Sequence, residues 1–204
     1  MGVLDVVPFV PFAPGRPPPT DLEGAVGLRN EFAQWLSATF ALPSFLYGPL
    51  PGGRIRTLPQ LRRQAFIDLP PDFGPRQPHP TAGATAVGAR SVLVAYNVWV
   101  SSLSVAQRVA PLVRSPMVRA LGLEVGDRAQ VSCNLVDPTN FGPAQLYDVV
   151  SELVTRDGGE VNGAELVGLV PQSVLKGIAA SRWAELGLFA SQTIEARLEG
   201  ATRR

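Results

Sequence analysis

The stretch "VRALGLEVGDRAQVSCNL", residues 118–135, contains two strand-like runs joined by a glycine–aspartate pair. Such a pair between two runs of this kind is a signal for a β-hairpin. In the second run Val131, Cys133 and Leu135 share one side of the strand, because successive side chains alternate. The stretch therefore predicts an antiparallel hairpin with one apolar face.

The flanking sequence places this hairpin inside a regular α/β pattern. The pattern predicts strands over 91–100 and 160–170 and helices over 102–114, 142–159 and 171–187. The order strand, helix, strand, strand, helix, strand, helix is the split βαβ or ferredoxin-like arrangement with one extra helix. We therefore expect residues 91–204 to form an α/β unit with helices on one face of its sheet.

Residues 1–90 are richer in loops, since most of the 20 prolines lie there. The elements predicted here are a helix over about 21–40 with Asp21 as its cap, a strand over 44–48, a short helix over 56–66 capped by Thr57, and a long glycine–proline loop over 72–89. In the first helix, Phe32, Leu36 and Phe40 are predicted to share a face.

Polar residues recur on the strands of the second half. In the hairpin, Gln130, Ser132 and Asn134 point away from the apolar side, and Asn97 and Glu165 interrupt two other apolar strands. A sheet covered by helices on one side has a free opposite side. These residues either line a ligand wall on that side or belong to a solvated sheet face.

The composition excludes several classes of protein. The net charge of +1 gives no reason to expect a nucleic-acid partner or a membrane surface, and no apolar run reaches the roughly 18 residues of a membrane helix. The absence of a signal peptide and the single cysteine, Cys133, fit a cytoplasmic protein. One histidine and one cysteine do not make an ordinary zinc site, so we expect no metal.

The one histidine, His79, lies in the glycine–proline loop. A lone histidine in a loop is by default solvated or packed, but Gly74, Gly83 and Gly88 would allow a ligand to approach the backbone closely. Arginines also outnumber acids across residues 51–90, where only two aspartates occur. The six arginines are Arg54, Arg56, Arg62, Arg63, Arg76 and Arg90. This excess indicates either a solvated basic face or attraction for an anionic small molecule.

Several stretches together resemble one family. They are "MGVLDVVPFVPF" (1–12), "LPSFLYG" (42–48), "RTLPQLRRQAF" (56–66), "PDFGP" (71–75), "GATAVGAR" (83–90), "LVAYNV" (93–98), "AQVSCNL" (129–135) and "ELVGLVP" (165–171). In this order they resemble the formiminotransferase domain of glutamate formiminotransferase, which also occurs fused in formiminotransferase-cyclodeaminase. The resemblance runs from Met1 to about residue 180, and no cyclodeaminase part is present.

The resemblance implies two ferredoxin-like α/β subdomains with a folate-binding cleft between them. Residues 1–90 would be a partial N-terminal subdomain, 91–185 the C-terminal subdomain and 186–204 a helical tail. The implied reaction transfers a formimidoyl group from N-formimidoyl-L-glutamate to tetrahydrofolate in histidine breakdown. Tetrahydrofolate would be a co-substrate, and a homodimer is a further expectation.

Two windows resemble the folate-contacting segments of the family. The implied binding residues are Gly74, Pro75, Arg76, Gln77, Pro78, His79, Pro80, Thr81, Ala82, Gly83, Pro171, Gln172 and Ser173. The family's catalytic acid–base histidine belongs to a His-Pro-Arg motif directly before the stretch that begins here at Met1. No residue of this chain is therefore assigned as catalytic, and His79 is assigned to the ligand site.

Three alternatives follow from that departure. The chain is a true transferase whose start lies upstream, a non-catalytic folate-binding homologue, or a truncated gene fragment. A formyl donor in place of the formimidoyl donor also stays open. If the family's first strands are missing, "VLDVVPFV" (3–10) would be an unpaired apolar edge that favours self-association.

Overall fold

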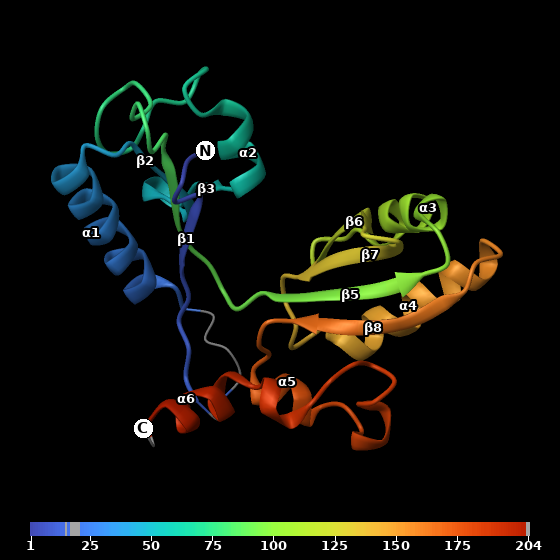
Figure 1. Ribbon diagram of the computed structural model, residues 1–204. Helices are drawn as coiled ribbons and strands as arrows, with labels where there is room; N and C mark the ends of the chain where they lie inside the picture. The colour runs from blue at the N-terminus through green and yellow to red at the C-terminus, as the bar shows by residue number, and fades with distance from the viewer. Residues whose placement is uncertain (15, 17–20, 203–204) are drawn as a thin grey trace. The chain divides into compact units, whose positions relative to one another are not determined.

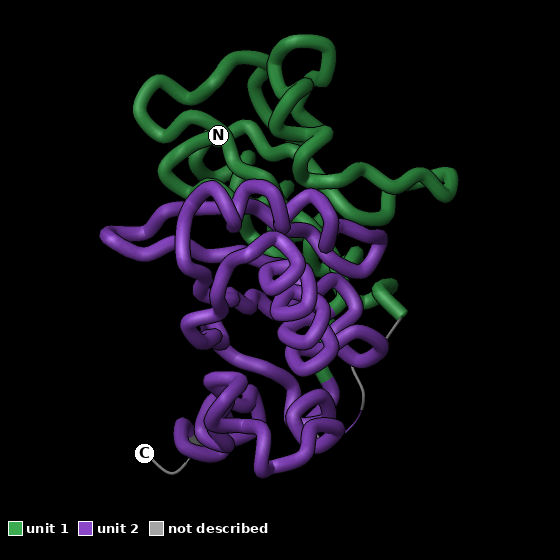
Figure 2. Tube along the Cα trace, turned by 90° about the vertical axis from the view of Figure 1, so that its right-hand side faces the viewer, with its two compact units in different colours: residues 1–12, 19–91 green, residues 13–18, 92–204 purple. Residues whose placement is uncertain are grey.

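The structure, a computed structural model, describes residues 1–14, 16 and 21–202. The chain divides into two compact units, which Figure 2 distinguishes by colour. Unit 1 comprises residues 1–12 and 19–91, and unit 2 comprises residues 13–18 and 92–204. Each unit has its own four-stranded sheet (Figure 1), so the fold is mixed α/β, as predicted.

The sheet of unit 1 has the strand order β1-β4-β2-β3. Its strands are β1 (Val6–Phe9), β2 (Ser44–Pro49), β3 (Ile55–Arg56) and β4 (Thr85–Ala89). The central strand β4 runs parallel to both β1 and β2, and the short β3 pairs antiparallel with β2. The helices of this unit are α1 (Glu23–Phe40) and α2 (Leu58–Gln64), and a single 3-10 turn, η1 (Pro51–Gly53), precedes β3.

The two helices cover opposite faces of this sheet, because side chains alternate along β2. Phe45 and Tyr47 belong to one buried cluster with Leu61 of α2. Leu46 belongs to the other cluster, with Ala33 of α1. Unit 1 therefore has two small apolar layers, one on each side of a mostly parallel sheet.

The predicted loop over 72–89 is wrong in its last part, because Thr85–Ala89 form the central strand β4 and are fully buried. The composition of this strand is unusual, since "TAVGA" consists mostly of small residues and contains only one β-branched apolar residue. The tight packing explains the small residues. A Cβ atom on Gly88 would lie 2.0 Å from the ring of Tyr47.

The edge predicted for residues 3–10 is confirmed in part. β1 is the outer strand of its sheet, but its inner side pairs with β4 from Val6–Ala86 to Phe9–Ala89. Pro8 lies within β1, and proline is a residue that protects an edge strand from further pairing.

The helix starts of unit 1 follow their sequence signals in part. Thr57 caps α2 in a capping box, in which its hydroxyl accepts from the Gln60 amide and the Gln60 side chain accepts from the Thr57 amide. The cap predicted at Asp21 is displaced by one residue, because Leu22 is the N-cap of α1 and makes no side-chain cap bond, although Asp21 accepts a hydrogen bond from the Glu23 amide. The predicted apolar face is wrong in one respect, because Phe40 is exposed at the end of α1.

Unit 2 has the ferredoxin-like order that the sequence predicts. Its antiparallel sheet runs β6-β7-β5-β8, with β5 (Val94–Val100), β6 (Val118–Val125), β7 (Arg128–Leu135) and β8 (Val161–Val167). Helices α3 (Leu103–Val113) and α4 (Pro143–Arg156) contact each other and pack on the sheet (Figure 1). The approach of α3 is close, since a Cβ on Gly122 would lie 2.5 Å from the backbone of Ala106.

The long helix predicted over 171–187 is wrong. The structure has a five-residue helix, α5 (Gln172–Lys176), then turns with the 3-10 segment η2 (Ala180–Arg182). Tertiary contacts explain the irregular path, because the Tyr96 hydroxyl donates to the Leu186 carbonyl and the Trp183 indole donates to the Ile178 carbonyl. A further 3-10 segment, η3 (Ala190–Gln192), and helix α6 (Ile194–Thr202) follow. No helix among residues 1–14, 16 and 21–202 is long and apolar enough to cross a membrane.

Candidate functional site

His79 opens a tight turn in unit 1. Its backbone N–H donates to the Gly83 carbonyl at 2.8 Å, and the Gly83 N–H donates back to the His79 carbonyl at 2.9 Å. The ring closes the same turn, because Nδ1 accepts from the backbone N–H of Ala82 at 3.1 Å and of Thr81 at 3.3 Å. With Nδ1 used as an acceptor, a neutral His79 carries its proton on Nε2 and can only donate there.

This turn borders an apolar pocket of about 290 Å³. The lining residues are Val3, Leu4, Phe40, Leu42, His79 and Ala82. The pocket combines apolar walls with the half-buried imidazole of His79, which is the usual composition of a small-molecule site. The exposure of Val3 and Phe40 at this position thus has a local explanation in the pocket.

The other residues of the first predicted window are mostly solvent-exposed. Pro75, Arg76, Gln77 and Pro78 are all exposed. Gly83 has a positive φ of 71°, and a Cβ there would lie 2.6 Å from the Met1 carbonyl oxygen and 2.9 Å from the Gly2 Cα. The close approach expected at Gly83 is therefore made by the chain's own first residues, with the Val3 amide donating to the Ala82 carbonyl.

The polar side chains predicted to share a face in unit 2 do so. Asn97 pairs in register with both Ser132 and Glu165, and its amide donates to the Glu165 carboxylate at 3.0 Å. On the opposite face Val131, Cys133 and Leu135 are buried. We call Asn97, Gln130, Ser132, Asn134 and Glu165 the polar face of unit 2.

The polar face is buried in part. Asn97 and Gln130 are 6% and 5% exposed, whereas Asn134 is exposed. The Gln130 Oε1 atom has no hydrogen-bond partner among the described residues. A buried polar atom without a partner is uncommon in folded proteins and marks a place where a ligand's polar group or water can bind.

The second predicted window, Pro171 to Ser173, lies at the start of α5 in unit 2. The backbone N–H of Gln172 donates to the Glu195 carboxylate at 2.9 Å, so that amide is already satisfied. The Ser173 hydroxyl is buried and has no partner in the part of the chain that the structure describes. Ser173 is thus the member of this window whose side chain is buried without a hydrogen-bond partner among the described residues.

The six arginines of residues 51–90 do not gather at one place in the structure. Arg62 pairs with Asp5 at 2.5 Å, and Arg90 donates to the Ser91 carbonyl. Arg54 and Arg56 line a second pocket in unit 1, which shares no lining residue with the His79 pocket. The predicted attraction for an anion therefore applies to two of the six arginines together.

Two further observations concern a nucleophilic thiol and a metal site. Burial raises the pKa of the Cys133 thiol to about 12, so this cysteine is not poised as a nucleophile. No group of three histidine, cysteine, aspartate or glutamate side chains that could hold a metal ion occurs among the described residues.

The chain resembles known proteins over most of its length. The profile of the formiminotransferase domain, N-terminal subdomain, matches residues 1–90. Glutamate formimidoyltransferase from Streptococcus pyogenes serotype M1 is 33% identical, and the similarity covers 88% of this chain and 64% of that protein. Formimidoyltransferase-cyclodeaminase from Mus musculus is 35% identical over 88% of this chain and 37% of that protein.

A more distant relative shows the same pattern. Glutamate formimidoyltransferase from Thermoplasma acidophilum is 27% identical over 98% of this chain and 71% of that protein. The chain thus spans less than two thirds of the bacterial and mouse relatives.

Proposed function

We propose that the chain is a member of the formiminotransferase-domain family, that it binds tetrahydrofolate, and that it takes part in transfer of a formimidoyl group from N-formimidoyl-L-glutamate to tetrahydrofolate. One observation carries the proposal, namely the 33% identity to a glutamate formimidoyltransferase over 88% of the chain. The same proposal places the protein in the cytoplasm, in histidine breakdown, with small-molecule partners and as a homodimer.

The binding residues of this proposal are those of the two windows, 74–83 and 171–173. In the first window His79 offers its Nε2–H as a donor beside apolar walls, which suits a flat heteroaromatic ring with acceptor atoms. In the second window the buried Ser173 hydroxyl is free to bond a polar ligand atom. Gln130, on the polar face, adds a second buried atom of the same kind.

The proposed reaction forms a bond from N5 of tetrahydrofolate to the formimidoyl carbon and breaks the bond from that carbon to the glutamate nitrogen. N5 loses a proton, and the departing nitrogen gains one. A positioned imidazole contributes about 10²–10⁴-fold to such a step. His79 is not that imidazole in this proposal, since its Nδ1 is held by the Thr81 and Ala82 amides.

The experiment is a binding and turnover measurement on the full chain. Titration calorimetry with tetrahydrofolate gives affinity, and mass spectrometry of the folate after incubation with N-formimidoyl-L-glutamate or N-formyl-L-glutamate gives turnover and donor. Saturable binding with a formimidoylated product supports the transferase. Binding without product supports the non-catalytic folate-binding alternative, and no binding contradicts the proposal.

A matched pair of variants tests the role of His79. His79→Phe keeps an aromatic ring in the pocket but removes both the Nε2–H donor and the Nδ1 acceptor of the turn, and we expect it to weaken tetrahydrofolate binding by at least about tenfold, the value of one hydrogen bond in a buried site. Arg63→Gln, on an exposed residue of α2 in the same unit, serves as the control. Equal affinities for both variants would remove His79 from the site.

A further inference from the structure

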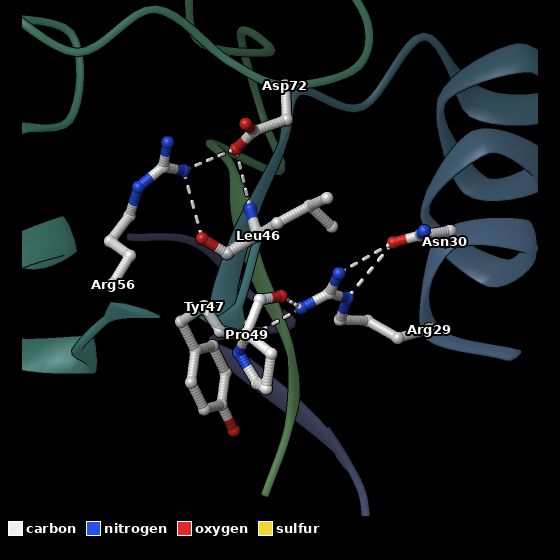
Figure 3. A network of polar contacts seen from close by, with 7 residues as sticks. All are labelled: Arg29, Asn30, Leu46, Tyr47, Pro49, Arg56 and Asp72. Carbon is white, nitrogen blue, oxygen red and sulfur yellow. Dashed lines mark hydrogen bonds and ion pairs between the residues drawn. The ribbon is translucent and has the colours of Figure 1, made fainter. Parts of the chain in front are cut away.

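Arg29 is a fully buried cation in unit 1. It lies on α1 with 0% exposure, and among the described residues its guanidinium donates to neutral oxygens only. One amino group donates to the Tyr47 and Pro49 carbonyls at 3.0 and 2.7 Å, while Nε and the other amino group donate to the Asn30 side-chain oxygen (Figure 3). No carboxylate lies within ion-pair distance of Arg29 among the described residues.

A second arginine lies beside it at the edge strand β3. Arg56 donates to the Leu46 carbonyl at 2.9 Å and to the Asp72 carboxylate at 2.6 Å, and that same Asp72 oxygen accepts from the Leu46 amide (Figure 3). Asp72 is thus already engaged by two donors on one oxygen. The Nε and second amino group of Arg56 have no partner within the described part of the chain.

A pocket of about 290 Å³ connects these groups. Its charged lining consists of Arg29, Arg54 and Arg56 against the single carboxylate of Asp72, so three positive charges face one negative charge. The remaining lining residues are Asn30, Leu46, Leu50, Pro51 and Phe73. All of them belong to unit 1.

The electrostatic environment favours an added negative charge. Burial lowers the pKa of the Arg29 guanidinium, the Asp72 charge raises it and the Arg56 charge lowers it further. A buried cation that is not matched by an anion is costly, and a neighbouring anion relieves that cost. A partly enclosed pocket of one sign also concentrates ligands of the other sign.

We propose that the pocket between α1, the end of β2 and β3 binds a small carboxylate ligand. The guanidinium fork matches a carboxylate with two parallel hydrogen bonds, and arginine is the side chain most suited to this recognition. Since ligand pockets range upward from about 300 Å³, this one accommodates a short mono- or dicarboxylate and not a nucleotide. The inference does not depend on the proposed transferase function.

The test uses glutarate as the probe and the full chain as the protein. Titration calorimetry at low salt is expected to show saturable glutarate binding, and the neutral analogue glutaramide is expected not to bind. Glutarate should also shift the Nε–H resonance of Arg29, since that N–H is buried and hydrogen-bonded to Asn30. Absence of saturable binding overturns the proposal.

Arg54→Gln and Arg63→Gln form a matched pair with the same change in charge. Arg54 lines the pocket, and in the described part of the chain its side chain makes one long bond, from Nε to the Pro51 carbonyl at 3.4 Å, so we expect its replacement to leave the fold intact. Arg63 is exposed on α2 outside the pocket. We expect Arg54→Gln to weaken glutarate binding by about fivefold and Arg63→Gln by less than about twofold.

Two outcomes contradict the assignment. If both variants lose affinity equally, glutarate responds to net charge and not to this pocket. If inorganic phosphate displaces glutarate and binds more tightly, the ligand chemistry is not a carboxylate. Neither result bears on tetrahydrofolate binding, which is measured in the absence of glutarate.

Discussion

The contact between Gly83 and the start of the chain allows a quantitative prediction. Gly83→Ala places a Cβ on a residue whose φ is +71°, which costs about 1 kcal/mol for a left-handed non-glycine residue. The new Cβ would also lie 2.6 Å from the Met1 oxygen and 2.9 Å from the Gly2 Cα. Those atoms are backbone, so the chain start must move away.

Moving the chain start breaks the hydrogen bond from the Val3 amide to the Ala82 carbonyl. That bond contributes about 1 kcal/mol, so the expected total loss in free energy of unfolding is about 2 kcal/mol. Urea unfolding followed by far-UV circular dichroism measures it. Mass spectrometry of hydrogen exchange should show faster exchange at the Val3 amide.

The control is Gly52→Ala in the same unit. Gly52 has a similar φ of +74°, but nothing lies within 4 Å of its added Cβ. Gly52→Ala should therefore cost only the backbone term of about 1 kcal/mol. Equal losses for the two variants, or unchanged exchange at Val3 in Gly83→Ala, would refute the contact between the turn and the chain start.

Three further predictions follow from other contacts. Gly88→Ala should destabilise the protein by about 2 kcal/mol through overlap with the Tyr47 ring in urea unfolding, and a Tyr47→Ala background should relieve the overlap. Burial raises the pKa of Cys133 from 9.0 to about 12, so stability should fall as pH rises from about 9 to 12, and alkylation at pH 8 should be slow until urea unfolds the chain. The Arg182 hydrogen bonds lower the pKa of Asp148, so Arg182→Met should raise that pKa in an NMR titration, and an unchanged value would contradict the ion pair.

Strands and helices with strong local signals were predictable. The hairpin of β6 and β7 has a glycine–aspartate turn and a regular alternation of apolar and polar side chains. The N-cap residue of α2 is Thr57, which forms a capping box. These signals act between residues close in sequence. For the same reason the shared side of Asn97 and Ser132 followed from alternation once the strands were paired.

The incorrect predictions concern segments in which contacts with distant residues override the local preference for a helix, strand or loop. β4 lacks the composition of a strand, but it is buried between β1 and β2, and only small residues fit beside Tyr47. The segment after α5 contains helix formers, but the Tyr96 hydroxyl and the buried Leu186 hold it in an irregular path. Neither constraint is visible from the segment's own sequence.

Arg29 is a different case, because its burial could be predicted from the sequence. The buried face of α1 consists of Ala25, Arg29, Ala33 and Leu36, which recur at helical spacing. A cation in the middle of such a stripe must either reach backbone carbonyls or face an anion, since a buried charge without partners is costly. Arg29 does the first through Tyr47 and Pro49, and the pocket beside it offers room for the second. Counting arginines over residues 51–90 does not identify this site, because Arg29 lies on α1, outside that range. Arg56 lies within the range, but only the pairing of β2 with β3 brings it close to Arg29.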